Sequence, residues 1–230
     1  MRTPVTGNKQ SIPGQFQFAG IDVGGPSKGF HLVGLTDGND ISCHRAFEPS
    51  QALTKLREWR ALSVAIDAPI TWAKEGKSRS CERALEAAGI HCFKTPTEYL
   101  AGSKSFYGWV RHGLLLYQTL AAAGFRYVDA GAEPGVGMTM METFPHAVAL
   151  RLNGVKPAGQ SKVKFRRLVL RDQNIQECRL SNLDFVDAAL CALVSKHAFK
   201  AGIDELERPG GKTSGMVIPK PAFGGKNECR

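Results

Sequence analysis

Acidic side chains stand at positions where a folded chain normally places apolar residues. Asp22 and Asp67 each end a short apolar run, and Glu142 follows a methionine-rich run. Asp184 and Asp187 interrupt the most apolar helical stretch of the chain. Because a buried carboxylate costs several kcal/mol unless a cation or hydrogen-bond donors compensate it, such acids are rarely left alone in a core. We therefore expect them to share a cation.

The types and the spacing of these acids suit a divalent metal ion. Asp184 and Asp187 are three residues apart, so both side chains can face one point from one helix. Carboxylate oxygens are the ligands that Mg²⁺ and Mn²⁺ prefer. Two such ions ~3.5–4 Å apart would stabilise the attacking and leaving oxygens of an in-line phosphoryl displacement. The pattern predicts a magnesium or manganese site that acts on phosphate.

Four of the five acids also have an ordinary structural explanation, whereas Asp187, beside Ala188 and Ala189, is harder to explain as part of a solvated face. Asp184 can be a first-turn acid favoured by the helix dipole, with Asn182 or Ser181 as the cap. Glu142 can cap the helix that follows it. Asp22 and Asp67 precede turn-forming residues and can belong to those turns. The joint placement of the acids, rather than any single one, favours the metal site.

The elements that would position the acids follow from the pattern of turns and apolar runs. Three strand-like runs are separated by the turn compositions Gly24-Gly25-Pro26 and Asp37-Gly38-Asn39-Asp40. Links this short predict an antiparallel meander. The three expected strands are Gln15–Asp22, Gly29–Thr36 and Ile41–Phe47.

Two further strands are expected beside the first one. A helix opened by Pro49 precedes the apolar run Leu62–Asp67, and a right-handed crossover would place that run parallel to the first strand. The run Val136–Glu142 resembles another parallel strand. Ligands of α/β proteins gather at the carboxyl ends of such strands, which is where Asp22 and Asp67 stand.

The chain is expected to form one main domain. Its 230 residues suit a single core. The expected domain spans residues 15–207, with a largely helical insertion at about 70–135. Residues 1–14 are expected to be a flexible arm, and residues 208–230 a tail rich in Gly, Pro and Lys.

The overall charge is strongly positive. The net charge is +9, and much of the excess falls between Lys156 and Arg179. Such a block favours encounter with a polyanion through phosphate contacts, although a solvated basic helix is the ordinary alternative. The expected nucleic-acid contacts are Lys28, Lys164, Arg166 and Arg167.

Composition argues against several other classes of protein. The six cysteines form no CxxC pair, which argues against zinc ribbons and redox dithiols. No apolar stretch approaches the ~20 residues of a membrane helix, so no membrane partner is expected. The first fifteen residues lack the apolar core of a secretory signal, and we expect a cytoplasmic protein of unknown oligomeric state.

A series of distinctive motifs runs in order from about Gly20 to Lys200. They are Gly20-Ile21-Asp22-Val23-Gly24-Gly25, Lys28-Gly29-Phe30, Ile66-Asp67-Ala68-Pro69, Cys81-Glu82-Arg83, Phe93-Lys94-Thr95-Pro96-Thr97, Phe106-Tyr107-Gly108-Trp109, Glu142-Thr143-Phe144-Pro145-His146 and Asp184-Phe185-Val186-Asp187-Ala188-Ala189. In this order the series resembles the family catalogued as domain of unknown function 429. The last motif is also similar to the Asp-x-x-Asp-Ala pattern in the final helix of RuvC-type Holliday junction resolvases.

The resemblance implies a ribonuclease H-like α/β fold and a nuclease activity inferred from that fold. The expected sheet is mixed and five-stranded, with an antiparallel three-strand meander and parallel strands, flanked by helices. By the same resemblance, the metal-binding acids would be Asp22, Asp67, Asp184 and Asp187. Glu142 has no equally clear counterpart in the resolvases.

The leading hypothesis is a metal-dependent nuclease that hydrolyses phosphodiester bonds of nucleic acid with Mg²⁺ or Mn²⁺. Its catalytic residues would be Asp22, Asp67, Glu142 and Asp187. A second hypothesis is a nucleic-acid or nucleotide-binding protein of the same fold without turnover. A third is an actin-like, ATP-dependent phosphotransferase, because the hairpin after Asp22 also resembles the first phosphate loop of that class. The chain is short for the two duplicated domains that the third hypothesis requires.

Overall fold

The computed structural model describes residues 15–128, 135–154, 156–211 and 214–221. The expected N-terminal arm, residues 1–14, lies outside these ranges, as does part of the expected tail, residues 208–230.

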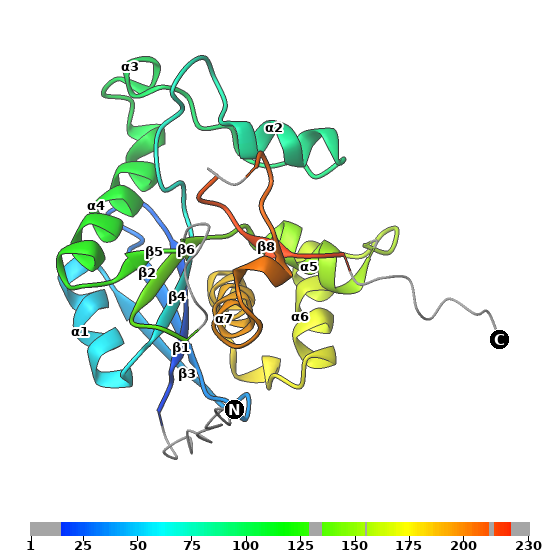
Figure 1. Ribbon diagram of the computed structural model, residues 1–230. Helices are drawn as coiled ribbons and strands as arrows, with labels where there is room; N and C mark the ends of the chain where they lie inside the picture. The colour runs from blue at the N-terminus through cyan, green and yellow to red at the C-terminus, as the bar shows by residue number, and fades with distance from the viewer. Residues whose placement is uncertain (1–14, 129–134, 155, 212–213, 222–230) are drawn as a thin grey trace, which may run out of the picture.

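A six-stranded mixed sheet forms the centre of the molecule, with the strand order β3-β2-β1-β4-β6-β5 (Figure 1). β1 pairs antiparallel with β2, and β2 antiparallel with β3. β4 is parallel to β1, and β6 is parallel to both β4 and β5. The strands are β1 (Phe18–Val23), β2 (Phe30–Leu35), β3 (Ile41–Ala46), β4 (Ser63–Asp67), β5 (Arg126–Tyr127) and β6 (Thr139–Glu142).

This topology confirms the predicted ribonuclease H-like arrangement, in which a three-stranded antiparallel meander is continued by parallel strands. The predicted count of five strands was too low. The sixth strand, β5, has only two residues and lies at the edge of the sheet beyond β6. A strand this short has no apolar alternation by which a sequence pattern could reveal it.

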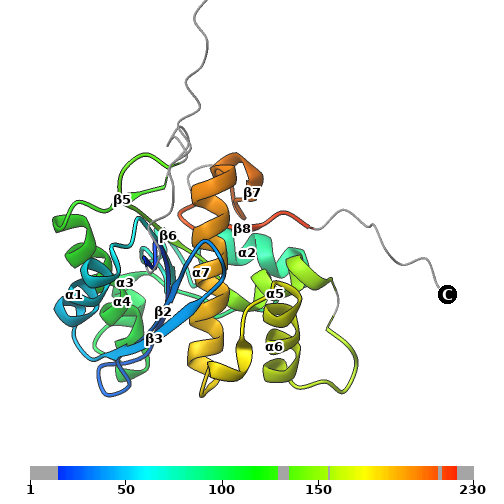
Figure 2. The same ribbon diagram turned by 90° about the horizontal axis from the view of Figure 1, so that it is seen from below.

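Helices cover both faces of the sheet. α1 and α4 pack together on one face, and α7 crosses the other face with α5 and α6 beyond it (Figures 1 and 2). The helices are α1 (Pro49–Trp59), α2 (Ser80–Ala87), α3 (Glu98–Ala101), α4 (Gly108–Ala122), α5 (Pro145–Asn153), α6 (Lys162–Asp172) and α7 (Leu183–Ala201), with the 3₁₀ turns η1 (Ser105–Tyr107), η2 (Glu177–Arg179) and η3 (Ile203–Glu205).

Successive side chains of each strand point to opposite faces of the sheet, so the buried residues form two cores, one on each face. Ala19 and Ile21 of β1 face the α1 and α4 side, whereas Phe18 packs with the apolar residues around α7. Because of this alternation, the assignment also fixes the direction of the polar residues that end each strand. Asp22 therefore points to the α7 face.

Gly20 permits α7 to lie unusually close to β1. A Cβ atom at this position would be 1.9 Å from the carbonyl oxygen of Ala188 and 2.3 Å from the backbone nitrogen of Ala192. Both contacts are to backbone and cannot be relieved by a side-chain rotation. The glycine thus sets the distance between β1 and the helix that carries Asp184 and Asp187.

The segment from 70 to 128 contains the helices α2, α3 and α4, with loops before α2 and between α2 and α3, and it ends with β5. Its last helix, α4, packs against α1 and belongs to the core of the main sheet. A second, two-stranded sheet joins β7 (Leu206–Glu207) to β8 (Ile218–Pro219) near the end of the described chain. No helix within the described ranges has both the length and the apolar character needed to cross a bilayer.

Candidate metal centre

Two strands and one helix bring three carboxylates together. Asp22 in β1 and Asp67 in β4 are direct partners in the parallel register, and both stand at the carboxyl ends of their strands. Asp187 approaches from α7, which packs against both strands. One carboxylate oxygen from each of the three residues lies within 4.8 Å of the others. The predicted convergence of these acids at one sheet edge is thus present in the structure.

The start of α7 determines how its two acids lie. The side chain of Asn182 caps the helix by accepting a hydrogen bond from the backbone nitrogen of Phe185, at 3.0 Å. Asp184 consequently falls in the first turn, and Asp187 follows one turn later on the same side of the helix. Asn182 is therefore the helix cap, as expected, and the same helix start also places Asp184 so that its side chain faces the sheet.

Burial and repulsion between neighbouring acids raise the pKa values of the three clustered acids. Burial, followed by repulsion from Asp187 and Asp184, raises the pKa of Asp22 to about 7. Burial and the neighbouring Asp22 raise the pKa of Asp67 well above its usual value. Burial also raises the pKa of Asp187 to about 6, although Arg166 opposes this change. A positive charge bound between these carboxylates would favour their ionised forms and so lower their pKa values.

Arg166 is part of this cluster rather than a free surface cation. It lies on α6, its exposed fraction is only 7%, and its Nη1 donates to both carboxylate oxygens of Asp187. The prediction that Arg166 contacts nucleic acid is not supported by this placement. On α6 it shares a buried face with Phe165, Val169 and Leu170, which turns it inward toward α7.

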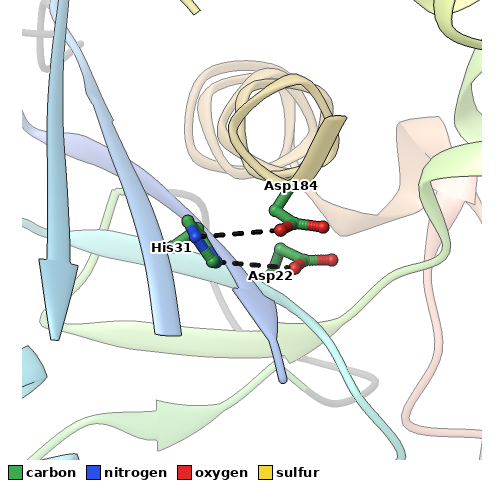
Figure 3. A group of neighbouring side chains, drawn as sticks. All are labelled: Asp22, His31 and Asp184. Atoms are coloured by element: carbon green, nitrogen blue, oxygen red, sulfur yellow. Dashed lines mark ion pairs between the residues drawn. The ribbon is translucent and has the colours of Figure 1, made fainter. Parts of the chain in front are cut away.

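Asp184 makes a second, more open group with Lys28 and His31. The Nζ of Lys28, on the loop between β1 and β2, donates to Asp184 Oδ1 at 2.7 Å. The imidazole of His31 lies between the two acids, with Nε2 3.7 Å from Asp184 Oδ2 and Nδ1 4.0 Å from Asp22 Oδ2 (Figure 3). Asp22 is therefore shared by two groups of potential ligands, Asp22–Asp67–Asp187 and Asp22–His31–Asp184.

Glu142, predicted as a catalytic residue, is not brought into the cluster. In the parallel register of β4 and β6 it is the partner of Ile66, one residue before Asp67. A one-residue offset reverses the face to which a strand side chain points. Glu142 consequently points away from the face that Asp67 shares with α7.

Glu142 instead anchors a buried ion-pair network. Both of its carboxylate oxygens accept hydrogen bonds from the Arg79 guanidinium, at 2.6 and 2.7 Å, and Oε2 also accepts from the backbone nitrogen of Ile70. Arg79 also donates to Glu82, whose other oxygen accepts from the backbone nitrogens of Arg79 and Thr95. This network ties β6 to α2 and to the loop that follows it.

The other predicted nucleic-acid contacts are placed differently from one another. Arg167 donates to the backbone carbonyl oxygens of Glu177 and Leu180, so its guanidinium fastens the turn that precedes α7. Lys164 is exposed on α6, and Lys28 is half-exposed beside Asp184. Lys28 and Lys164 remain candidates for phosphate contacts.

His31 was missed by the sequence reasoning, although a signal for it was present. It is the one ionisable residue in the apolar run Phe30–Leu35. The turn between β1 and β2 pairs Val23 with Phe30, which places His31 directly opposite Asp22. A register count across the predicted hairpin would therefore have found it.

The residues present fit a divalent cation. The clustered oxygens of Asp22, Asp67 and Asp187 are hard ligands of the kind that Mg²⁺ and Mn²⁺ bind. Burial and neighbouring acids raise the pKa values of these carboxylates, and a cation bound among them would favour their ionised form. Asp67 also borders a small cavity of about 50 Å³ lined in part by Arg79, Trp109 and Glu142.

Comparisons with known proteins add a family and a weak structural likeness. A Thermus thermophilus RuvC structure is similar at 17% sequence identity and a TM-score of 0.38, over 80% of this chain and 93% of that one. A likeness at this level does not establish a shared activity. No curated protein matches the chain. A family model matches residues 20–211, which is most of the sequence, and this chain therefore belongs to the family described as protein of unknown function (DUF429).

Proposed function

We propose that the protein is a metal-dependent nuclease, which hydrolyses phosphodiester bonds of nucleic acid at the Asp22–Asp67–Asp187 centre with Mg²⁺ or Mn²⁺. The observation that carries the proposal is the convergence of three largely buried carboxylates from β1, β4 and α7 within 4.8 Å. Carboxylates alone would repel a phosphodiester, so this centre can act on phosphate only with cations in place. Bound there, such cations would stabilise the charge that develops on the attacking and leaving oxygens.

The protein's own residues prepare this centre in distinct ways. Asp22 and Asp67 are held side by side by the strand register, which fixes their separation without side-chain contacts. Arg166 keeps the Asp187 carboxylate oriented and counters the burial that raises its pKa. Lys28 orients Asp184 at the exposed side of the centre.

Charge supports nucleic acid as the substrate. The chain carries a net charge of +9, which attracts polyanions. Lys28 and Lys164 are accessible on the elements that carry the centre or pack against it. Phosphate contacts from such side chains would position a strand without reading its sequence.

A cleavage assay tests the proposal. The purified chain with Mg²⁺ or Mn²⁺ should cut at least one form among single strands, duplexes, RNA–DNA hybrids and four-way junctions. Asp67→Asn should lower the rate by a factor of about 10³ or more, since it removes a ligand without changing the size of the side chain. Asp172→Asn, which changes an exposed acid at the end of α6, serves as the matched control and should retain full activity.

Binding without cleavage would favour the second hypothesis, a nucleic-acid-binding protein without turnover. In that case the affinity for nucleic acid would fall with salt, and Asp67→Asn would leave it unchanged. Absence of cleavage on every substrate form with both metals would contradict the nuclease proposal.

A further inference from the structure

His31 is a buried side chain without a hydrogen-bond partner for one of its ring nitrogens. Only 3% of the residue is exposed, and its Nδ1 has no partner among the described residues. That nitrogen faces Asp22 Oδ2 at 4.0 Å, and Nε2 faces Asp184 Oδ2 at 3.7 Å (Figure 3). Both distances exceed those of a hydrogen bond. The ring is thus desolvated and aimed at two carboxylates without bonding to either.

A neutral imidazole carries one N–H donor and one nitrogen with a free lone pair, and this is the form that binds a metal ion. The position of the His31 ring between Asp22 and Asp184 places its nitrogens beside two carboxylate oxygens. Phe185 of α7 packs edge-on against the ring, with centroids 4.9 Å apart, and holds its orientation.

We propose that Asp22, His31 and Asp184 form a second cation subsite, which shares Asp22 with the Asp22–Asp67–Asp187 subsite and selects a transition-metal dication over Mg²⁺. One ligand atom from each of the three residues lies within 4.8 Å of the others. An imidazole nitrogen suits first-row transition metals, whereas Mg²⁺ prefers oxygen ligands alone. The second subsite deepens the proposed function and rests on it, because it concerns the metal occupancy of the same centre.

Lys28 restricts which oxygen of Asp184 is available. Its ammonium already engages Oδ1, so the oxygen that faces His31 is Oδ2. The two subsites would therefore differ in chemistry: three carboxylates form one, and two carboxylates with one imidazole form the other. Mn²⁺, which accepts both ligand types, is the probe that can occupy both.

Pulsed electron paramagnetic resonance of the tag-free, metal-stripped chain loaded with two equivalents of Mn²⁺ tests the subsite. The wild-type spectrum should contain ¹⁴N modulation from a directly bound imidazole. His31→Gln should remove this modulation, and His44→Gln should retain it. His44 is the matched control, because it lies on the neighbouring strand β3 outside the acid cluster.

Calorimetry gives a second readout on the same proteins. Mn²⁺ should bind wild type at two sites and His31→Gln at one site. Mg²⁺ affinity should change less than about twofold in His31→Gln, since the all-oxygen subsite keeps its ligands.

Absence of ¹⁴N modulation in wild type would overturn the subsite whether or not any variant folds, and so would its persistence in His31→Gln. The nuclease proposal fails separately. Nitrogen ligation without cleavage of any nucleic acid would keep the subsite and remove the nuclease, and cleavage without nitrogen ligation would do the reverse.

Discussion

Asp22 is the residue on which both ligand groups depend. It is the strand partner of Asp67 on one side and of His31 on the other. Its pKa is raised to about 7 by burial and by the charges of Asp187 and Asp184. In the metal-free protein an ionised Asp22 therefore weakens the fold, and a bound cation would reverse this effect.

Asp22→Asn should stabilise the metal-free protein at high pH. Because the folded-state pKa of Asp22 lies above its unfolded value of about 3.8, wild type binds more protons when folded and loses stability as the pH rises toward 7. A tenfold change in an acid dissociation constant corresponds to about 1.4 kcal/mol, so the variant should gain at least ~1–2 kcal/mol on wild type between about pH 5 and pH 8. Urea unfolding in EDTA measures this difference. With saturating Mn²⁺ at the higher pH, wild type should become the more stable protein.

In the metal-free protein, the guanidinium of Arg166 is the positive charge that pairs with Asp187. Arg166→Gln removes one partner of a buried ion pair, which typically costs about 3–5 kcal/mol. The loss should be large in EDTA at about pH 8 and smaller with saturating Mn²⁺, because the cation then compensates Asp187. Arg171→Gln on the same helix breaks an exposed pair with Glu177 and should change stability little under either condition. An equal loss from Arg166→Gln with and without Mn²⁺ would mean that Arg166 does not act on the metal centre.

At the scale of single elements, strand register decides which acids meet. β4 and β6 are both parallel strands with an acid at the carboxyl end, yet Glu142 is offset by one residue from Asp67. The offset sends Glu142 to Arg79, in a network that also holds Glu82.

Glu142→Gln should weaken the fold while leaving metal binding intact. The variant removes the charge that pairs with the buried Arg79, and we expect a loss of about 3 kcal/mol in the free energy of unfolding. Calorimetry with Mn²⁺ below the unfolding temperature should give the wild-type stoichiometry. Loss of a bound metal in a folded Glu142→Gln protein would instead make Glu142 a ligand.

The packing of α7 on β1 provides a test that touches no acid. Gly20→Ala forces a Cβ against the backbone of Ala188 and Ala192, so the helix must move away from the strand. We expect a loss of about 1–3 kcal/mol or more and at least a roughly tenfold weaker Mn²⁺ affinity, because Asp187 moves with the helix. Gly25→Ala is the control, since its Cβ would meet no atom within 4 Å. Unchanged Mn²⁺ affinity in a folded Gly20→Ala protein would show that the centre tolerates movement of α7.

At the scale of the whole molecule, the parts of the fold that could be predicted from the sequence are those that depend on local sequence patterns. The meander and the parallel strand after α1 follow from turn chemistry and apolar runs, and they suffice to bring Asp22 to Asp67. The three-residue spacing predicts that Asp184 and Asp187 lie on one side of α7, and the packing of this helix on β1 and β4 brings Asp187 to the other two acids. Three features could not be predicted, because they depend on the strand register and on the packing between helices, which no local sequence pattern encodes. They are the offset of Glu142, the inward orientation of the Arg166 side chain and the two-residue strand β5.

The positive charge attracts nucleic acid to the molecule as a whole. Two variants of equal net charge can separate the effect of where a charge lies on the surface from the effect of the net charge. Lys164→Glu and Arg57→Glu change the net charge equally, but Lys164 is on α6 beside α7, whereas Arg57 is exposed on α1 across the sheet. If nucleic acid lies against the α6 and α7 side, Lys164→Glu should weaken duplex binding and reduce the slope of log affinity against log salt by about 0.9 for the lost contact. Arg57→Glu should leave the slope unchanged. Titrations in Ca²⁺ or EDTA at several salt concentrations measure both values, and equal effects of the two variants would mean that only the net charge attracts nucleic acid.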